Sequence, residues 1–453
     1  MNLIGNEVFC SKRSVLSIVF FVMQHTVATA SFLPSNFRLK LSRSMFMPSS
    51  QTCLVRRLSL SSSSDIGGEH NQVVMTSQTP SVEEDYKLDP LYIKNSRTRH
   101  LLEQECAYNL AQDVVNRVIA RSINDGGYGS GTSPILTRIG SDNPDIPIYR
   151  ALFSRDHATT FDPPYKSYLP TAENELSKTT GSRNFAFQLA YKGDQFRGWQ
   201  MQRPDLEKEF CTVQGKLVKL LETHLRPENS LSSKALDVRC AGRTDASVNA
   251  IGQICRVRTK RRNFGPGKVN IQTILNAINT YSDPDEGEPS LYCIRVDEVH
   301  SSFHPTFCAL SRAYIYLIDL ESDQNQLNEG HVGSLNKMLK SCEGVELDYF
   351  GMSHGKVKTE TTLCTLKRSR ATLVEYCAEK NPHSRRRAVC IELIGDRFLR
   401  RMVRKIVGTA IREVLSNKQI VGNELIDVVL KKDRKLSGYA APSSGLIFVG
   451  ACY

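Results

Sequence analysis

The strongest constraint on the fold is an alternation of strand-like and helix-like segments that begins at Phe185. Apolar side chains occupy every second position over 185–191, which is the period of a half-buried strand. The next apolar run, 213–225, has helical spacing, follows Thr212 as a capping residue and stops before Pro227. Further strands and helices of these kinds follow at 236–240, 251–257, 271–278, 291–299 and 313–320. Without a Rossmann glycine pattern, this alternation predicts an α+β fold, a sheet with helices packed on one face. A sheet face left open beside basic residues is a common RNA-binding surface.

A second informative segment, 396–415, combines a broad apolar stripe with a set of arginines. It predicts one long helix, which Asp396 can cap. The arginines recur at steps of three and four residues, so on a helix they would share one side: Arg397, Arg400, Arg401 and Arg404. Such a set of arginines usually forms a basic face that is exposed to solvent. The functional alternative is a set facing phosphates, with one arginine turned inward to hold a carboxylate.

The first 64 residues have the composition of a targeting leader. Two basic residues precede the apolar run 15–22, and the small-residue triplet 28–30 follows it, as in a signal peptide. The basic, Ser-rich and acid-poor stretch after the triplet is typical of an organelle transit peptide. We expect residues 1–64 to direct the chain to an organelle, a plastid in preference to a mitochondrion. The apolar run is too short to predict a membrane span, so we expect no membrane association.

The interval 65–182 is rich in Ser, Thr, Asp, Gly and Pro, which predicts a linker or a disordered region. The exception is 101–119, where apolar residues roughly keep helical spacing and predict a single helix. We expect residues before about Thr179 to be dispensable for folding and activity, because they lack the pattern of a core.

Charge and cysteine usage narrow the classes of partner and site. The 453-residue chain has a formal net charge of +12, which suits a polyanion such as a nucleic acid. A basic leader plus general solubility is the alternative. The 13 cysteines form no CxxC pair and the histidines no HxH pair, so we predict no metal site. The odd number and scattered spacing of the cysteines fit reduced thiols.

One loop combines several residue types that chemistry uses. Between the strands at 236–240 and 251–257 lies the string AGRTDA, residues 241–246, which ends on Asp245 and Ala246. A glycine, a cation, a hydroxyl and a carboxylate at the end of a strand are well placed for a site, because loops on rigid scaffolds carry chemistry. The alternative is that Asp245 caps a turn or a short helix.

Six segments together resemble the TruA family of tRNA pseudouridine synthases, and they occur in the family's order over roughly residues 183–453. The matching strings are LAYKGDQFRGWQMQ at 189–202, TVQGKL at 212–217, AGRTDASVNAIGQI at 241–254, FHPTFCALSRAYIY at 303–316, RFLRRMVRKIVGTAIREV at 397–414 and APSSGL at 441–446.

The resemblance implies an architecture and an activity. It implies two similar lobes of mainly antiparallel sheet with helices, an N-terminal lobe at 183–300 that carries the catalytic loop and a C-terminal lobe at 301–453. A basic RNA-binding cleft would lie between the lobes, and the enzyme would be a homodimer. The reaction implied is the isomerisation of uridine to pseudouridine in tRNA, at positions 38–40 of the anticodon stem-loop, without metal or organic cofactor.

The resemblance also implies roles for individual residues. Asp245 matches the nucleophilic Asp, Arg243 matches the Arg associated with flipping the uridine out of the stack, and Arg404 matches the Arg that pairs with the catalytic carboxylate. The remaining matches bind substrate: Tyr314 matches the Tyr that packs against the flipped base, and Leu446 matches an apolar pocket residue. Arg400 and Arg401 are expected to face tRNA phosphates because they belong to the arginine set at 397–404, and not because of the resemblance. Flipping is required because the uracil is inaccessible inside a helix.

The chain departs from the family pattern at a few positions. Ser247 and Asn249 stand where the family usually has Gly and His, and Thr306 and Cys308 stand where it has Arg and Ser. None of these departures removes a matched catalytic group, so we expect them to affect RNA binding and substrate range instead of catalysis. Ala246 follows the bacterial style, which fits an organellar enzyme. The alternatives to an isomerase are a catalytically silent tRNA-binding paralogue and an RNA-folding helper, which a turnover assay separates from the enzyme.

Overall fold

The structure is a computed structural model that describes most of the chain after residue 89. The described residues are 90–105, 108–125, 134–140, 150–153, 162–170, 182–202, 211–225, 236–260, 271–281, 289–320, 327–357, 359–378, 381–416 and 419–453. All of them belong to one compact unit, Pro80–Tyr453. The leader predicted for residues 1–64 lies outside the described residues.

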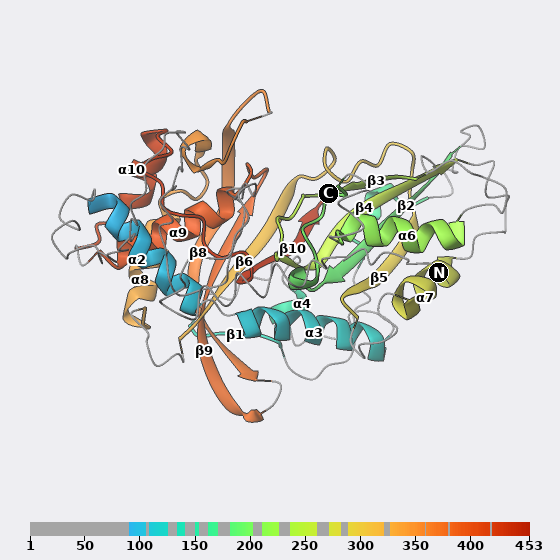
Figure 1. The fold of residues 1–453 in the computed structure, drawn as a ribbon, viewed down its shortest axis with the longest axis horizontal. Helices are drawn as coiled ribbons and strands as arrows, with labels where there is room; N and C mark the ends of the chain where they lie inside the picture. The colour runs from blue at the N-terminus through green and yellow to red at the C-terminus, as the bar shows by residue number, and fades with distance from the viewer. Residues whose placement is uncertain are drawn as a thin grey trace, which may run out of the picture. The chain divides into compact units, whose positions relative to one another are not determined.

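One large sheet organises this unit (Figure 1). Its ten strands are β1 (Thr137–Arg138), β2 (Ser182–Tyr191), β3 (Asp237–Cys240), β4 (Asn249–Lys260), β5 (Leu291–Glu298), β6 (Ser311–Asp319), β7 (Glu346–Asp348), β8 (Leu363–Ala378), β9 (Asn381–Gly395) and β10 (Leu446–Cys452). The order is β1-β8-β9-β6-β10-β4-β2-β5, with β3 beside β4 and β7 beside β8. Strand β10 runs antiparallel to β6 and parallel to β4, and the other strand pairs are antiparallel. The predicted α+β class is therefore confirmed.

Helices flank both ends of the sheet. They are α2 (Pro90–Glu105), α3 (Tyr108–Asp125), α4 (Arg150–Phe153), α6 (Val213–Leu225), α7 (Ile271–Tyr281), α8 (Gly330–Lys340), α9 (Met402–Val414) and α10 (Glu424–Leu430). The strands predicted from 185 to 320 and the helices predicted at 213–225 and 271–278 are confirmed as β2 to β6, α6 and α7. Thr212 caps α6 as predicted, because its Oγ1 accepts from the backbone N–H of Gly215 at 3.1 Å.

The strands bury different residues on their two faces. On β6, Tyr314 and Tyr316 belong to one hydrophobic cluster, which also contains residues of α6, α7, α8 and α9. Between them, Ile315 belongs to a second cluster, which contains the apolar side of α3. The same alternation runs through β5 and β10. The prediction that helices cover only one face is therefore wrong, because α3 packs on the other face.

Around 101–119, where the sequence predicted one helix, the structure has two. They are α2 and α3, on either side of residues 106–107. Six apolar residues of α3 are buried in the second cluster: Leu110, Ala111, Val114, Val115, Val118 and Ile119. Helix α2 is joined to α9, because Arg412 Nη1 donates to Asn95 Oδ1 at 2.9 Å in a buried position.

The helix predicted over 396–415 begins later than expected. Helix α9 starts at Met402, after Arg401, whose backbone has φ 61° and ψ 6° and so cannot continue a right-handed helix. Asp396 does not cap it and accepts instead from the N–H groups of Arg397 and Thr365. Of the four arginines predicted to share a helix face, only Arg404 lies on the helix.

Candidate active site

The loop that carries Asp245 is held by buried polar side chains of the neighbouring strands. Gln253 of β4 donates through Nε2 to the carbonyl of Gly242 at 2.7 Å. The hydroxyl of Tyr191 on β2 lies 2.8 Å from Thr244 Oγ1, and the carbonyl of Thr244 accepts from the N–H of Trp199 at 3.1 Å. Each of these partners is fully or nearly fully buried, so the loop backbone is fixed on both sides of Arg243.

The turn after Asp245 shows why the family's usual glycine suits this position. Ser247 has a φ of 63°, in the left-handed region that favours glycine. A side chain there costs about 1–3 kcal/mol of strain. The turn stays in place because the N–H of Ser247 donates to the carbonyl of Phe196 and the N–H of Val248 donates to that of Asp245, both at 3.3 Å.

Asp245 forms an ion pair with the first turn of α9. Arg404 Nη1 lies 3.3 Å from Asp245 Oδ2, and Arg404 Nε donates to the carbonyl of Ala441 at 2.6 Å. The carboxylate keeps 31% of its side-chain surface exposed and the guanidinium 15%. Burial lowers the pKa of Arg404, and the charge of Asp245 opposes that shift. The carboxylate is thus oriented by a largely buried cation and is itself still accessible.

Arg401 is a second cation next to the same carboxylate. Its Nε lies 3.9 Å from Asp245 Oδ2, and this buried atom has no hydrogen-bond partner. Its left-handed backbone adds strain at the same place. Strained backbone and an unsatisfied buried donor are typical of functional sites. Arg400 is exposed, and its carbonyl accepts from the N–H of His354 at 3.1 Å.

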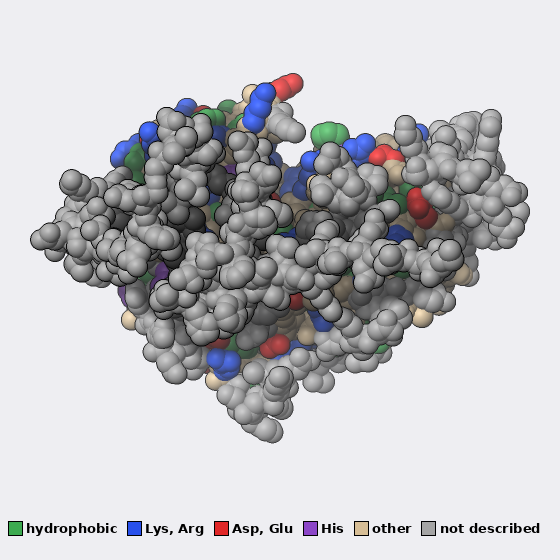
Figure 2. Space-filling model, viewed as in Figure 1, with side chains coloured by type: hydrophobic (Ala, Val, Ile, Leu, Met, Phe, Trp, Pro, Cys, Tyr) green, Lys and Arg blue, Asp and Glu red, His purple; other side chains and the backbone are tan. Residues whose placement is uncertain are grey.

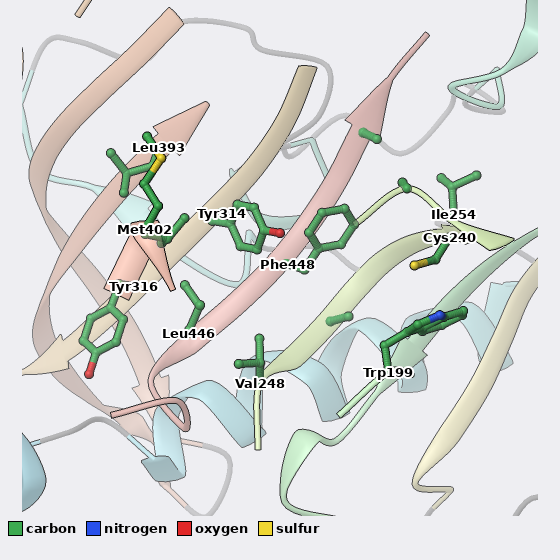
Figure 3. Packing of buried hydrophobic residues seen from close by; sticks show 14 of the residues in the cluster. Trp199, Cys240, Val248, Ile254, Tyr314, Tyr316, Leu393, Met402, Leu446 and Phe448 are labelled. Carbon is green, nitrogen blue, oxygen red and sulfur yellow. The ribbon is translucent and has the colours of Figure 1, made fainter. Parts of the chain in front are cut away.

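Tyr314 and Leu446 lie in the apolar floor beside the loop. The Tyr314 ring packs edge-on against Phe448 and Phe398, with centroids 5.0 and 5.1 Å apart. Figure 3 shows Tyr314 next to Phe448 on the neighbouring strand, with Leu446 close by. A Cβ on Gly242 would lie 3.2 Å from the Tyr314 hydroxyl, so the loop and this ring are in close contact. Burial raises the pKa of Tyr314, which keeps the phenol neutral.

The structure thus brings together five of the seven residues predicted for the site. Asp245, Arg404 and Arg401 form a charged cluster, and Tyr314 contacts the loop beside the buried Leu446. Arg243 is exposed on the same loop and Arg400 is exposed just before α9. Figure 2 shows Lys and Arg side chains on the upper edge of the face that it draws.

Arg312 is a further functional residue, which the sequence reasoning missed. It is buried at the start of β6, and its guanidinium donates to three backbone carbonyls, those of Ala241, Asp396 and Thr306. These carbonyls belong to the Asp245 loop, the segment before α9 and the loop before β6. Arg312 therefore holds three site segments in register. The available signal was a charged residue inside an otherwise apolar strand.

Two departures from the family pattern have structural roles. Thr306 Oγ1 donates to the carbonyl of Cys240 at 2.6 Å, at the end of β3. The Asn249 side chain is fully buried; its Nδ2 donates to the carbonyl of Ser444 at 2.9 Å. Its Oδ1 accepts from the N–H of Gly193 at 2.8 Å and from Gln112 Nε2, on α3, at 3.1 Å. Asn249 thus joins the Asp245 loop to the segment before Leu446 and to α3.

Two further searches of the described residues bear on the expected partners. No group of three or more His, Cys, Asp or Glu side chains among them could hold a metal ion. None of the helices among them has the length and apolar character needed to cross a membrane.

Comparisons with known proteins identify relatives of the chain. No family model matches the chain. A tRNA pseudouridine synthase A of Chloroflexus aurantiacus is 30% identical over 280 residues, which cover 60% of this chain and 89% of the relative. A tRNA pseudouridine synthase A 2 of Protochlamydia amoebophila is 26% identical over 62% of this chain and 99% of its own length. One of Brachyspira hyodysenteriae is 27% identical over 58% and 96%. Since these relatives are matched over nearly their whole length, the chain belongs to the tRNA pseudouridine synthase A (TruA) family.

Proposed function

We propose that this protein is an isomerase that converts uridine to pseudouridine in tRNA, with Asp245 as the nucleophile. The observation that carries the proposal is the partly exposed Asp245 carboxylate, paired with Arg404 and seated beside the apolar floor of Tyr314, Leu446 and Phe448. A flipped uracil needs such a floor, and an attacking carboxylate must stay ionised and reachable. The relatives named tRNA pseudouridine synthase A support tRNA as the substrate.

The chemistry divides between the base and these residues. The N1–C1′ bond breaks, the base turns, and a C5–C1′ bond forms. The hydrogen on C5 leaves to solvent and N1 gains a proton, so no redox partner is needed. Asp245 provides the nucleophilic carboxylate, Arg404 orients it, and the Tyr314 ring supports the freed base while it turns. We propose that the exposed Arg243 assists flipping.

We propose further that the target uridine lies in the anticodon stem-loop and that the RNA is held in a basic cleft between two lobes, one on each side of the β4–β10 pair. The cations near the site support this arrangement, because phosphate contacts need guanidinium or ammonium groups. Arg400, exposed just before α9, is the candidate phosphate contact, together with Arg401. The enzyme is proposed to act as a homodimer.

Release of tritium tests the activity directly. A tRNA transcript labelled with tritium at C5 of uridine should release label into water when incubated with the protein. The same transcript with every anticodon stem-loop uridine replaced by cytidine should not release label. Label release from both transcripts would overturn the proposed position, and release from neither would overturn the proposed reaction. In the latter case, the protein would be a silent tRNA-binding paralogue or an RNA-folding helper.

We also propose that residues 1–64 carry the chain to a plastid, on the strength of their basic, Ser-rich and acid-poor composition. A fluorescent reporter fused behind residues 1–64 should enter an organelle. A reporter that stays diffuse in the cytosol would contradict targeting, and one that enters mitochondria would contradict only the plastid destination.

A further inference from the structure

Phe307 is the most exposed large hydrophobic side chain in the described part of the chain, with 84% of its surface accessible. It lies in the loop between β5 and β6, in the string that contains the departures Thr306 and Cys308. A single exposed apolar residue is ordinary on a protein surface and carries no meaning alone. The surroundings of this ring, however, fix its position and place it beside the Asp245 loop.

The ring has a fixed orientation because His304 supports it from one side. The two ring centroids are 4.3 Å apart with an interplanar angle of 30°, which is a stacked arrangement. His304 Nδ1 accepts from the backbone N–H groups of Thr306 and Phe307, at 3.2 and 3.3 Å. The turn is therefore closed by the same imidazole that backs the ring, and the rest of the Phe307 surface faces solvent.

The turn is also tied to the start of the catalytic loop. Thr306 Oγ1 donates to the carbonyl of Cys240 at 2.6 Å, and the carbonyl of Thr306 accepts from Arg312 Nη2. Arg312 Nε donates at 2.8 Å to the carbonyl of Ala241, four residues before Asp245. The exposed ring and the catalytic carboxylate are thus carried by segments that share one buried guanidinium.

The charge around the turn suits a nucleic acid. Arg239 and Arg256 act electrostatically on His304, and the Arg239 side chain is more than half exposed. Asp237 is the acidic group in this neighbourhood, and it pairs with both arginines. The exposed Arg243 follows on the same strand-to-loop connection. An aromatic ring among cations is the usual composition of a surface that stacks unpaired bases.

We propose that Phe307, backed by His304, is a stacking platform for an unpaired base of the RNA substrate, adjacent in the RNA to the uridine bound at Asp245. This inference rests on the proposed function, because it names a further part of the same substrate. Extrusion of a uridine removes the stacking partner of its neighbour, and an exposed ring fixed near the site can replace that partner.

Binding measurements on three variants test the platform. Phe307→Ala should weaken the Kd for tRNA roughly 5- to 100-fold, which is the contribution of one base stacked on an aromatic ring. Phe307→Tyr keeps the ring and should bind within about twofold of wild type. Leu310→Ala removes another exposed apolar side chain, one without a ring, from the same loop, and should also bind within about twofold.

The log–log salt slope separates stacking from phosphate contact. Phe307→Ala should leave the slope unchanged, since no counterion is released by a ring. A 2-aminopurine placed next to the target uridine should be quenched on binding to wild type and to Phe307→Tyr, but less quenched on binding to Phe307→Ala.

Wild-type affinity in Phe307→Ala, or equal losses in Phe307→Ala and Leu310→Ala, would overturn the platform. A change in sedimenting mass in Phe307→Ala would assign the ring to contact between copies of this chain instead. These failures differ from failure of the proposed function. If wild type releases no tritium, the proposed reaction is refuted, while tRNA binding still tests the stacking platform. If wild type turns over and Phe307→Ala binds normally, only the proposed platform is refuted.

Discussion

The two faces of the central strands contrast in what packs on them near the site. On β10, Leu446 and Phe448 face the side of the active site, whereas Ile447 and Val449 face α3. On the α3 side, Gln112 of α3 donates hydrogen bonds to Asn249 and Asp194 beside a cluster of apolar side chains. The other side holds Asp245 and its two arginines.

The difference shows where this chain tolerates strain. Two of its three non-glycine residues with positive φ, among those described, are near Asp245: Ser247 follows it by two residues, and the Nε of Arg401 lies 3.9 Å from its carboxylate. Arg401 Nε is buried without a hydrogen-bond partner, and Phe307 is exposed in a loop that Arg312 joins to the Asp245 loop. Such features cost stability and persist only where the surrounding structure over-determines them. Helix α3 contributes to this support, since Gln112 of α3 bonds Asn249, which is joined to the Asp245 loop.

The first prediction concerns a substitution that should abolish activity on the active-site side of the sheet and leave the α3 side unchanged. Asp245→Asn should abolish pseudouridine formation, because the nearly isosteric amide is uncharged and a poor nucleophile. Binding of tRNA should be nearly unchanged, since affinity rests on many phosphate contacts. Tritium release and filter binding measure the two quantities. Turnover near the wild-type rate would refute the assignment of Asp245. The melting temperature and tRNA binding of the variant are the controls, because they show whether lost turnover comes from lost folding.

The second prediction concerns deletion of α3, the helix that packs on the opposite face of the sheet. A chain shortened to begin at residue 134 lacks α2 and α3, so it exposes the sheet residues that six apolar side chains of α3 cover. Each buried aliphatic side chain contributes about 1.5–3 kcal/mol, and the sum is comparable to the whole stability of a domain. We expect this chain to aggregate or unfold, whereas a chain that begins at Pro80 should remain folded.

This outcome is the reverse of what composition alone predicted, namely that residues before about Thr179 are dispensable. Thermal melting and sedimentation of the two shortened chains decide between them. A folded, active chain beginning at residue 134 would show that the α3 contact is not needed.

The third prediction cuts the link between the two sides. Gln112→Ala removes one of two donors to Asn249 Oδ1, which should cost about 1 kcal/mol of stability and lower kcat several-fold with little change in KM. Gln112→Glu should be worse, because it places an acceptor against an acceptor. The matched control is Gln272→Ala, an exposed glutamine that bonds Asn276 at 2.8 Å on α7. An equal loss in all three variants would leave Gln112 without a special role.

Much of the fold follows from local pattern. The strands β2 to β6 and the helices α6 and α7 were predictable because their periodicity, capping residue and stop signals lie within each segment. The start of α9 was not, since the left-handed backbone of Arg401 overrides a sequence that continues in helical spacing. The docking of α3 was not either, because it depends on contacts with strands far along the chain.

The site divides in the same way. The AGRTDA loop was identifiable as a candidate from its residue types, but the Asp245–Arg404 pair joins residues 159 positions apart and entered only through the family resemblance. Arg312 and Gln112 were missed because their roles are hydrogen bonds to distant backbone and side-chain atoms. No periodicity encodes such contacts.

The fourth prediction sharpens the electrostatics of the active-site side. Arg400→Ala should make the log–log salt slope of tRNA binding shallower by about 0.9, the effect of one lost phosphate contact. The control is Arg385→Ala on β9, an exposed arginine that pairs with Glu375 at 3.5 Å and should leave the slope unchanged. An unchanged slope in Arg400→Ala would mean that this side chain does not meet phosphate.

The last prediction has the smallest expected effect and concerns pH. Burial, with the charges of Arg256 and Arg239, lowers the pKa of His304, and Asp237 opposes this shift. The Nδ1 lone pair that holds the Phe307 turn is therefore present at neutral pH and is lost on protonation. Because the folded pKa lies below the unfolded value of about 6.5, the turn has its full stability above pH 6.5 and loses stability as the pH falls below it. We expect the ratio of wild-type to Phe307→Ala affinity, measured at fixed salt, to fall towards one below pH 6.5. In His304→Asn the ratio should stay flat, since the amide oxygen can accept the same two N–H groups without titrating. A ratio that does not change with pH in wild type would show that the imidazole is not needed to hold the ring.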